Sequence, residues 1–351
     1  MERTGITMEI SKKLFGKTKD GLDVHAFTLK NNQGSYITFL DYGATVRAIV
    51  IKDASGIDRD ICLGYNTVSD YENNDGYLGA CIGRVGNRIG KGQFTLNGVS
   101  YQLALNDGEN HLHGGIKGFD KHLFDVETSE NSITFSRVSP DGEENYPGNL
   151  KLSVTCTFND DNQFILDYHA VSDQDTIINL TNHTYFNLSG ENDGDITDHL
   201  LQLNAASFTA NDNACLPTGE ILPVSGSSFD FRSPKVIGKE INHNEQQLLR
   251  AGGYDHNFVL DGKGMRQIAI VSSPKTHLSL NVYTDKPGVQ FYSGNFLTGQ
   301  IGKSGSAYAK RSGFCLETQY FPNAMACRNF PSPVLRADEE YHFTTIYEFI
   351  N

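Results

Sequence analysis

The chain has 351 residues, of which 38% are hydrophobic and 20% charged, a composition typical of globular proteins with a substantial core. Its formal net charge of -13 argues against nucleic acid as a partner, because phosphates bind to concentrated Lys and Arg surfaces. No apolar run approaches the ~18 residues of a membrane span, and residues 1–17 contain no apolar stretch of signal-peptide length. We therefore expect a cytoplasmic protein with a small neutral ligand and no membrane partner.

Short runs rich in Val, Ile, Thr, Phe and Tyr recur along the chain and are typical of β-strands. They cover residues 35–51, 132–139, 150–158, 163–171, 176–188, 277–284, 288–294, 313–320 and 341–350. Turn signals separate them, among them Asn97-Gly98 and Asp141-Gly142.

Helical periodicity is rare. Residues 67–75 could hold a turn or two, and so could residues 233–253, which open on Ser-Pro and close on Gly252. No strand-helix-strand rhythm appears, which disfavours a Rossmann fold or a barrel of parallel strands. The sequence predicts one all-β domain over residues 1–351, a large antiparallel β-sandwich with a few short helices.

The six cysteines show no C-x-x-C spacing, and most lie in apolar, strand-like surroundings. Reduced thiols in the core are the interpretation that fits this pattern. The positions are Cys62, Cys81, Cys156, Cys215, Cys315 and Cys327.

The stretch TNHTYFNLSG, residues 181–190, carries an unusual polar pattern. If it is a strand, His183, Tyr185 and Asn187 share one face, while Phe186 and Leu188 point to the other. A core histidine whose hydrogen bonds go to the backbone is the commoner explanation. A polar ligand on that face is the alternative.

Glu317 is a second candidate, because the run around it otherwise lacks charge. A carboxylate there either faces solvent on a half-exposed strand, the commoner case, or is buried for a purpose. Other segments place an amide, a guanidinium, an imidazole or a carboxylate near glycines and aromatic rings, a combination suited to sugar hydroxyls and sugar C–H faces. The side chains are Asn87, Arg88, His113, Asp255, Gln290 and Tyr292.

Neither a metal nor a nucleotide is expected. His111 and His113 lie two residues apart and could share a strand face, but zinc needs three or four ligands and no matching cluster stands out. The GKSG of residues 302–305 has Leu297 where a phosphate-binding loop requires glycine.

Six motifs together bear a family resemblance: GRVGNRIGKGQF, NHLHGG, TNHTYFNLSG, GYDHNFVL, GVQFYSGNFLTG and LETQYFPNA. In this order and at about this spacing they resemble the aldose 1-epimerase (galactose mutarotase) family, from about residue 20 to the end. The resemblance implies a galactose mutarotase-like supersandwich with an open sugar cleft and no cofactor.

The resemblance also implies the site residues. His183 is expected to be the general acid and Glu317 the general base of ring opening in free hexoses such as galactose or glucose. We expect proximity to favour the charged forms of both side chains. The substrate-holding set implied by the motifs is Asn87, Arg88, His113, Asp255 and Gln290, with Tyr185 beside His183.

Two alternatives stay open. An epimerase of the same fold acting on hexose 6-phosphate would need an Arg/Lys cluster, and only Arg84 and Arg88 lie close in sequence. A sugar-binding protein without catalysis is the other, although the presence of both His183 and Glu317 argues against it. A monomer or a weak homodimer is expected.

Overall fold

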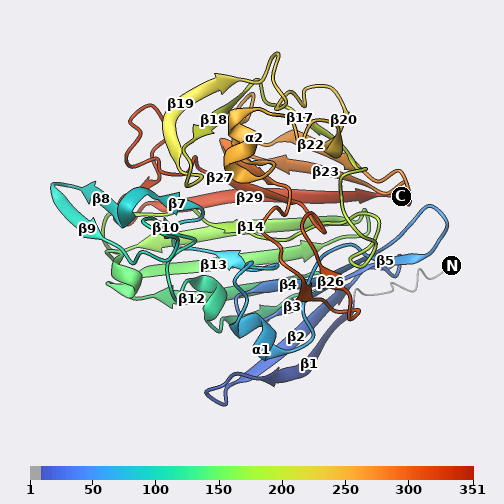
Figure 1. Cartoon of the computed structure of the whole chain (residues 1–351). Coiled ribbons are helices and arrows are strands. Elements are labelled where there is room, and N and C mark those ends of the chain that lie inside the picture. The colour runs from blue at the N-terminus through green and yellow to red at the C-terminus, as the bar shows by residue number, and fades with distance from the viewer. Residues whose placement is uncertain (1–8) are drawn as a thin grey trace.

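In the computed structural model, which describes residues 9–351, a nine-stranded antiparallel sheet crosses the middle of the molecule, with β29 running between β14 and β23 (Figure 1). Along β14, Phe164, Leu166 and Tyr168 are buried while Asp167 and His169 are half-buried, so one face is packed and the other is open. The strand order is β11 (Asp125–Thr128), β12 (Ser132–Ser139), β13 (Leu150–Phe158), β14 (Gln163–Ser172), β29 (Glu340–Ile350), β23 (Ser279–Thr284), β22 (Arg266–Ser272), β17 (Leu200–Leu203) and β20 (Lys235–Val236).

Two five-stranded sheets pack against the buried face. The N-terminal sheet comprises β1 (Glu9–Lys17), β2 (Asp23–Lys30), β3 (Tyr36–Leu40), β4 (Thr45–Lys52) and β5 (Asp58–Asp60). The C-terminal sheet has the order β19 (Pro217–Pro223), β18 (Ser207–Asn211), β21 (Asp255–Val259), β24 (Gly288–Tyr292) and β27 (Cys315–Gln319).

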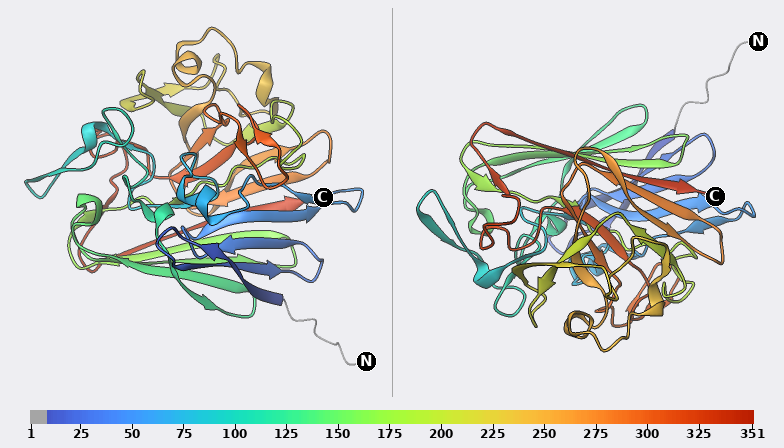
Figure 2. Two further views of the ribbon diagram at one scale, coloured as in Figure 1. Left: turned by 60° about the horizontal axis from the view of Figure 1, so that its bottom comes forward. Right: turned by 90° about the horizontal axis from the view of Figure 1, so that it is seen from above.

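Aromatic contacts join these layers. The ring of Phe39 in the N-terminal sheet lies 5.6 Å from that of Phe164, and Figure 2 shows the blue strands stacked beside the green ones. On the other side, the Tyr347 hydroxyl of β29 donates to the Leu316 carbonyl of β27 at 2.9 Å. The predicted antiparallel sandwich is therefore confirmed.

The remaining elements are short. The paired strands are β6 (Cys81–Ile82) with β16 (Thr181–Asn182), β7 (Arg88–Ile89) with β10 (His111–Leu112), β8 (Gln93–Leu96) with β9 (Val99–Gln102), β15 (Thr176–Ile177) with β28 (Val334–Leu335), and β25 (Gln300–Ile301) with β26 (Ala307–Tyr308). The α-helices are α1 (Val68–Glu72) and α2 (Gln246–Ala251), and the 3-10 helices are Gly90–Gly92, Phe119–Lys121, Glu143–Asn145 and Ile237–Lys239. Among the described residues, no helix has the length and apolar character needed to cross a membrane.

Both predicted helical segments contain a helix, with different bounds. Helix α2 ends as expected at Gly252, whose φ of 67° is the left-handed conformation that glycine adopts easily. It begins at Gln246, however, and not at the Ser-Pro start, because residues 235–236 pair with β17 and a 3-10 turn follows. The Asn97-Gly98 turn joins β8 to β9 as a two-residue hairpin loop.

The expectation of a strand over residues 176–188 is wrong for most of that range. Only β15 and β16 are paired strands, and Phe186 forms isolated bridges to Cys62 and Phe314. The backbone here passes between several partners instead of following one, so no continuous ladder can form.

The largest apolar cluster takes residues from Phe27 to Phe349, and all six cysteines are free and buried, as predicted. Because this cluster draws on all three large sheets, we propose that residues 9–351 form one domain. The sequence predicted that this domain also includes residues 1–8, which lie outside the described part of the chain.

Candidate active site

A pocket of about 220 Å³ lies on the C-terminal sheet, on the face turned away from the core. The alternation of side chains along β27 shows which of them point into this pocket. Thr318 of β27 points toward the nine-stranded sheet, where its hydroxyl lies 2.6 Å from that of Thr345. Because side chains alternate along a strand, the preceding Glu317 points the other way and lines the pocket.

Neighbouring strands bring further polar groups to the same face. In the ladder, Gln290 of β24 lies opposite Glu317, and Asp255 of β21 lies opposite Tyr292. Gln290 does not line the pocket itself: its Nε2 donates to Asp255 Oδ1 at 2.8 Å, and its Oε1 accepts from Gln319 Nε2 at 3.0 Å. The structure thus places Gln290 beneath Asp255, where it orients the carboxylate.

The opposite wall comes from three connecting segments. His183 follows β16, His113 follows β10, and Asn87 precedes β7. The backbone N–H of Asn87 donates to His113 Nδ1 at 3.0 Å, and the N–H of His113 donates to the Asn87 carbonyl at 3.0 Å. Both residues have positive φ, 61° and 50°, a conformation uncommon outside glycine that is held here by the mutual bonds.

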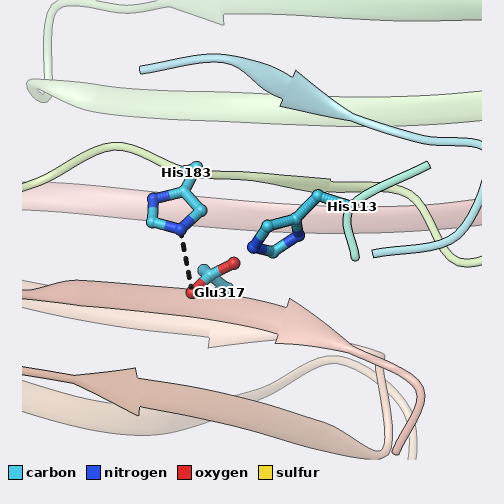
Figure 3. A group of neighbouring side chains, drawn as sticks. All are labelled: His113, His183 and Glu317. Carbon is cyan, nitrogen blue, oxygen red and sulfur yellow. Dashed lines mark ion pairs between the residues drawn. The ribbon is translucent and has the colours of Figure 1, made fainter. Parts of the chain in front are cut away.

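The two imidazoles and the carboxylate converge, as Figure 3 shows. Nε2 of His183 lies 3.7 Å from Oε1 of Glu317, and both side chains are almost fully buried. Oε2 of Glu317 has no hydrogen-bond partner among the described residues. Since a buried polar atom without a partner costs free energy, this oxygen is suited to receive a ligand hydroxyl.

Aromatic rings surround His183. Tyr185 stacks on it with ring centroids 5.0 Å apart, Tyr77 stacks at 6.0 Å, and Tyr292 meets it edge-on at 6.2 Å. The hydroxyl of Tyr185 donates to the Gly76 carbonyl at 2.7 Å, which fixes this ring in the wall. These rings provide apolar faces next to the polar groups, the combination that sugars require.

Burial shifts both ionisable groups toward their neutral forms. It lowers the pKa of His183 to about 4 and raises the pKa of Glu317 well above its ordinary value, to which the negative charge of Asp255 adds. The expectation that proximity keeps both charged is therefore wrong for the pocket without a ligand, because desolvation outweighs the attraction between them. Burial therefore favours the neutral imidazole of His183 and the protonated carboxyl of Glu317.

His113 is also neutral. Burial lowers its pKa well below the ordinary value, and the positive charges that His183 and Arg88 can carry lower it further. Because its Nδ1 accepts from Asn87, the single ring proton must lie on Nε2. The ring thus offers one N–H donor toward the pocket.

A charged cluster closes the other end. Nε of Arg88 donates to Asp107 at 2.7 Å. Burial lowers the pKa of Arg88, but Asp255 and Asp107 together raise it, so the guanidinium stays charged. Burial raises the pKa of Asp255. The positive charge of Arg88 and the hydrogen bond from Gln290 lower it, but the net shift is upward.

Seven of the eight residues expected at the site line this pocket, and Gln290 lies behind it. Asn187 of the 181–190 stretch is elsewhere: it is fully buried and its Nδ2 donates to the carbonyls of Gly194 and Ser312. Asp75, Tyr77, Phe296 and Gln300 also line the pocket and were not predicted from the sequence. Tyr77 directly follows Gly76, and a ring next to glycine in a loop was the available signal.

His113, His183 and Glu317 also lie close enough to share a metal ion, since one donor atom of each lies within 4.8 Å of the others. The sequence showed no such cluster because Glu317 is distant along the chain. The histidine that lies beside His113 as a second possible metal ligand is thus His183. His111 is not available for this, because its Nε2 lies 2.6 Å from the Tyr146 hydroxyl.

Comparisons with known proteins agree with this geometry. Residues 25–348 match the family model described as aldose 1-epimerase. The chain is 44% identical to galactose mutarotase of Sus scrofa, covering 97% of this chain and 99% of that protein, and 38% identical to aldose 1-epimerase of Escherichia coli strain K12, covering 94% and 96%. The crystal structure of galactose 1-epimerase from Lactobacillus acidophilus superimposes with a TM-score of 0.86 at 32% identity, over 98% of this chain and 99% of that one.

Proposed function

This chain belongs to the aldose 1-epimerase family and is an isomerase that interconverts the anomers of an aldose; from this premise we propose that free galactose and glucose are substrates and that His183 and Glu317 perform the proton transfers. The observation that carries the proposal is the 3.7 Å separation of His183 Nε2 and Glu317 Oε1 at one buried end of the pocket. A hydroxyl and a ring oxygen of one pyranose are close enough together to meet both groups.

Ring opening needs two proton transfers. The C1 hydroxyl loses its proton to Glu317, the C1–O5 bond breaks to leave an aldehyde, and O5 takes a proton from His183. Rotation about C1–C2 exposes the other face of the aldehyde, and the reverse transfers close the ring. Each positioned transfer typically contributes ~10²–10⁴-fold to the rate.

The proton count of the pair agrees with this cycle. Neutral His183 with protonated Glu317 holds the same number of protons as imidazolium with carboxylate. The resting pair therefore reaches the reactive form by moving one proton between its members, and a sugar hydroxyl placed between them can carry it. No net proton is taken up from solvent over the cycle.

The other lining residues hold the sugar in this proposal. Asp255 accepts hydrogen bonds from hydroxyls, Arg88 and the Nε2–H of His113 donate them, and the ring of Tyr185 packs against a C–H face. Asn87 acts through His113, whose Nδ1 it binds. Gln290 acts through Asp255 in the same way.

The charge of the pocket supports a neutral sugar over a hexose 6-phosphate. Among the lining residues, Arg88 is the one cationic side chain, and Asp75 and Asp255 oppose it. Arg84 is not available to bind phosphate, because its buried guanidinium donates to the Pro147 carbonyl at 2.7 Å and to Ser139 Oγ at 2.7 Å.

A cytoplasmic location and a monomer or weak homodimer remain our proposals. Six free, buried thiols support a reducing compartment. Sedimentation at several protein concentrations measures the state of assembly.

The test is polarimetry on the pure protein with single anomers of galactose, glucose and xylose, and with glucose 6-phosphate. Acceleration of galactose or glucose mutarotation by the wild type, and none by Glu317→Gln, is expected. Acceleration limited to the phosphorylated sugar, or equal acceleration by both proteins, would contradict the proposal.

A further inference from the structure

A second cluster of ionisable side chains lies on the open face of the nine-stranded sheet. Asp167 and His169 point outward from β14, and Glu340 and His342 from the neighbouring β29. His169 and His342 are direct cross-strand partners, and their rings stack with centroids 4.0 Å apart at an interplanar angle of 19°. Nothing in the proposed sugar chemistry uses this cluster.

The carboxylate of Asp167 faces both imidazoles. Nε2 of His342 lies 2.8 Å from Oδ1, and Nε2 of His169 lies 3.2 Å from Oδ2. On the opposite side of the His169 ring, Nδ1 lies 2.8 Å from Oε1 of Glu340. The hydroxyl of Thr344 also donates to Asp167 Oδ1, at 2.7 Å. One imidazole is thus held between two carboxylates.

The cluster combines ligand types that transition metals favour. Neutral imidazole nitrogens and carboxylate oxygens both bind divalent ions of this class. The Nε2 atoms of His169 and His342 both face the Asp167 carboxylate, so one divalent cation can bind all three residues.

We propose that Asp167, His169 and His342 form a binding site for a divalent transition-metal ion of the Zn²⁺ type. The donor atoms fit, since one from each residue lies within 4.8 Å of the others. Zn–N and Zn–O bonds of about 2.0–2.2 Å at tetrahedral angles place neighbouring donors roughly 3.3 Å apart. His169 Nε2 lies 3.2 Å from Asp167 Oδ2 and His342 Nε2 lies 2.8 Å from Asp167 Oδ1, so each imidazole is close to that separation from one carboxylate oxygen.

Glu340 completes the arrangement. By accepting the Nδ1–H of His169, its carboxylate leaves the Nε2 lone pair free for the metal and fixes the ring orientation, a partner that metal-bound histidines usually have. The His342 side chain is 49% exposed, so a water molecule can reach the fourth coordination position.

The proposed metal site is separate from the sugar pocket. His169 and His342 point outward from the nine-stranded sheet, and Glu317 points outward from the C-terminal sheet packed on its opposite face. Ion binding here should leave mutarotation unchanged, so failure of this proposal would not affect the proposed sugar chemistry.

The test is calorimetric titration of the chelator-treated chain with ZnCl₂ in excess galactose, with Co²⁺ absorption spectra to report tetrahedral coordination. We expect one ion per chain. His342→Asn, His169→Asn and Asp167→Asn should each weaken binding more than tenfold, and Glu340→Gln by about 10–100-fold, as for outer partners of metal ligands.

The matched control is His277→Asn. This exposed histidine lies outside the cluster and has φ 61°, a conformation that asparagine tolerates. It should bind zinc like the wild type. The four cluster variants and this control should all keep wild-type mutarotation as a check on folding. Undiminished zinc binding in His342→Asn would overturn the proposal. So would a loss seen in Glu317→Gln alone, which would place the ion in the sugar pocket.

Discussion

His183 and Glu317 face each other across 3.7 Å, slightly beyond hydrogen-bond length, in surroundings that favour the neutral form of each. The gap matters because a direct hydrogen bond would have to break before either group met a substrate. Glu317 Oε2, which lacks a partner among the described residues, remains free as well. The pair is therefore arranged to bind a third polar group between its members, and this arrangement leads to the first two predictions.

Glu317→Gln should abolish mutarotation while preserving the fold, because the amide keeps the shape of the side chain but cannot accept the proton. The turnover number should fall ~10²–10⁴-fold, with KM changed little, as expected for a group that acts in the transition state. Polarimetry measures the rate, and thermal unfolding confirms the fold. A variant that keeps more than about a tenth of the wild-type kcat would show that Glu317 is not the base.

The pH profile of the wild type should be a broad bell. Activity requires one proton shared by the pair, so a second proton added at low pH and loss of the shared proton at high pH both inactivate. Because the pKa of His183 is lowered to about 4, the acid limb should lie near pH 4 and not near an ordinary histidine value. Because the pKa of Glu317 is raised, the alkaline limb should lie well above an ordinary carboxylate value.

This profile has a control in His183→Asn, which should lose activity at every pH. An acid limb near pH 6.5 in the wild type would mean that burial does not control His183, and the neutral resting pair would have to be given up.

Asp255→Ala should weaken sugar binding by roughly 1.5–3 kcal/mol, the contribution of a hydrogen bond to a charged group. The kcat should fall as well, since a misplaced anomeric carbon transfers protons less well, though less than in Glu317→Gln. Calorimetry with galactose and polarimetry measure the two effects. Unchanged affinity together with unchanged turnover would place Asp255 outside the sugar site.

Gln290 should act only through Asp255, because its Nε2 bonds to that carboxylate and it does not line the pocket. Gln290→Ala should therefore raise KM less than Asp255→Ala does, and the double variant should resemble Asp255→Ala alone. A double-mutant cycle measures this coupling. Additive effects would instead indicate that Gln290 contacts the sugar directly.

Chelation by EDTA should leave mutarotation unchanged. His113, His183 and Glu317 are read as sugar contacts and proton carriers, and the proposed surface site lies on another sheet. Polarimetry before and after dialysis against EDTA is the measurement. Activity lost on chelation and restored by a divalent cation would show that these three side chains hold a catalytic metal.

Much of the fold could be predicted from local pattern. Alternating apolar residues over 132–139, 150–158 and 163–171 correspond to β12, β13 and β14, because period-two alternation is what a sheet with one buried face requires. The pattern failed over 183–188, where Phe186 forms isolated bridges to Cys62 and Phe314 and no strand continues. His183 and Tyr185 share the pocket as the alternation predicted, but Asn187 bonds to the Gly194 and Ser312 carbonyls instead.

For the site, the sequence determined which residue types were available and, through six motifs in order, which family they resemble. Only the tertiary structure decided which of them meet. It brought His113 and His183 together through the segments that follow β10 and β16. Pairing of β21 with β24 set Gln290 behind Asp255, because cross-strand register decides what a strand side chain touches. The tertiary structure also decided that the pKa of His183 is lowered and that of Glu317 raised, since desolvation depends on how much protein surrounds a group, and residues far apart in the chain provide that surrounding.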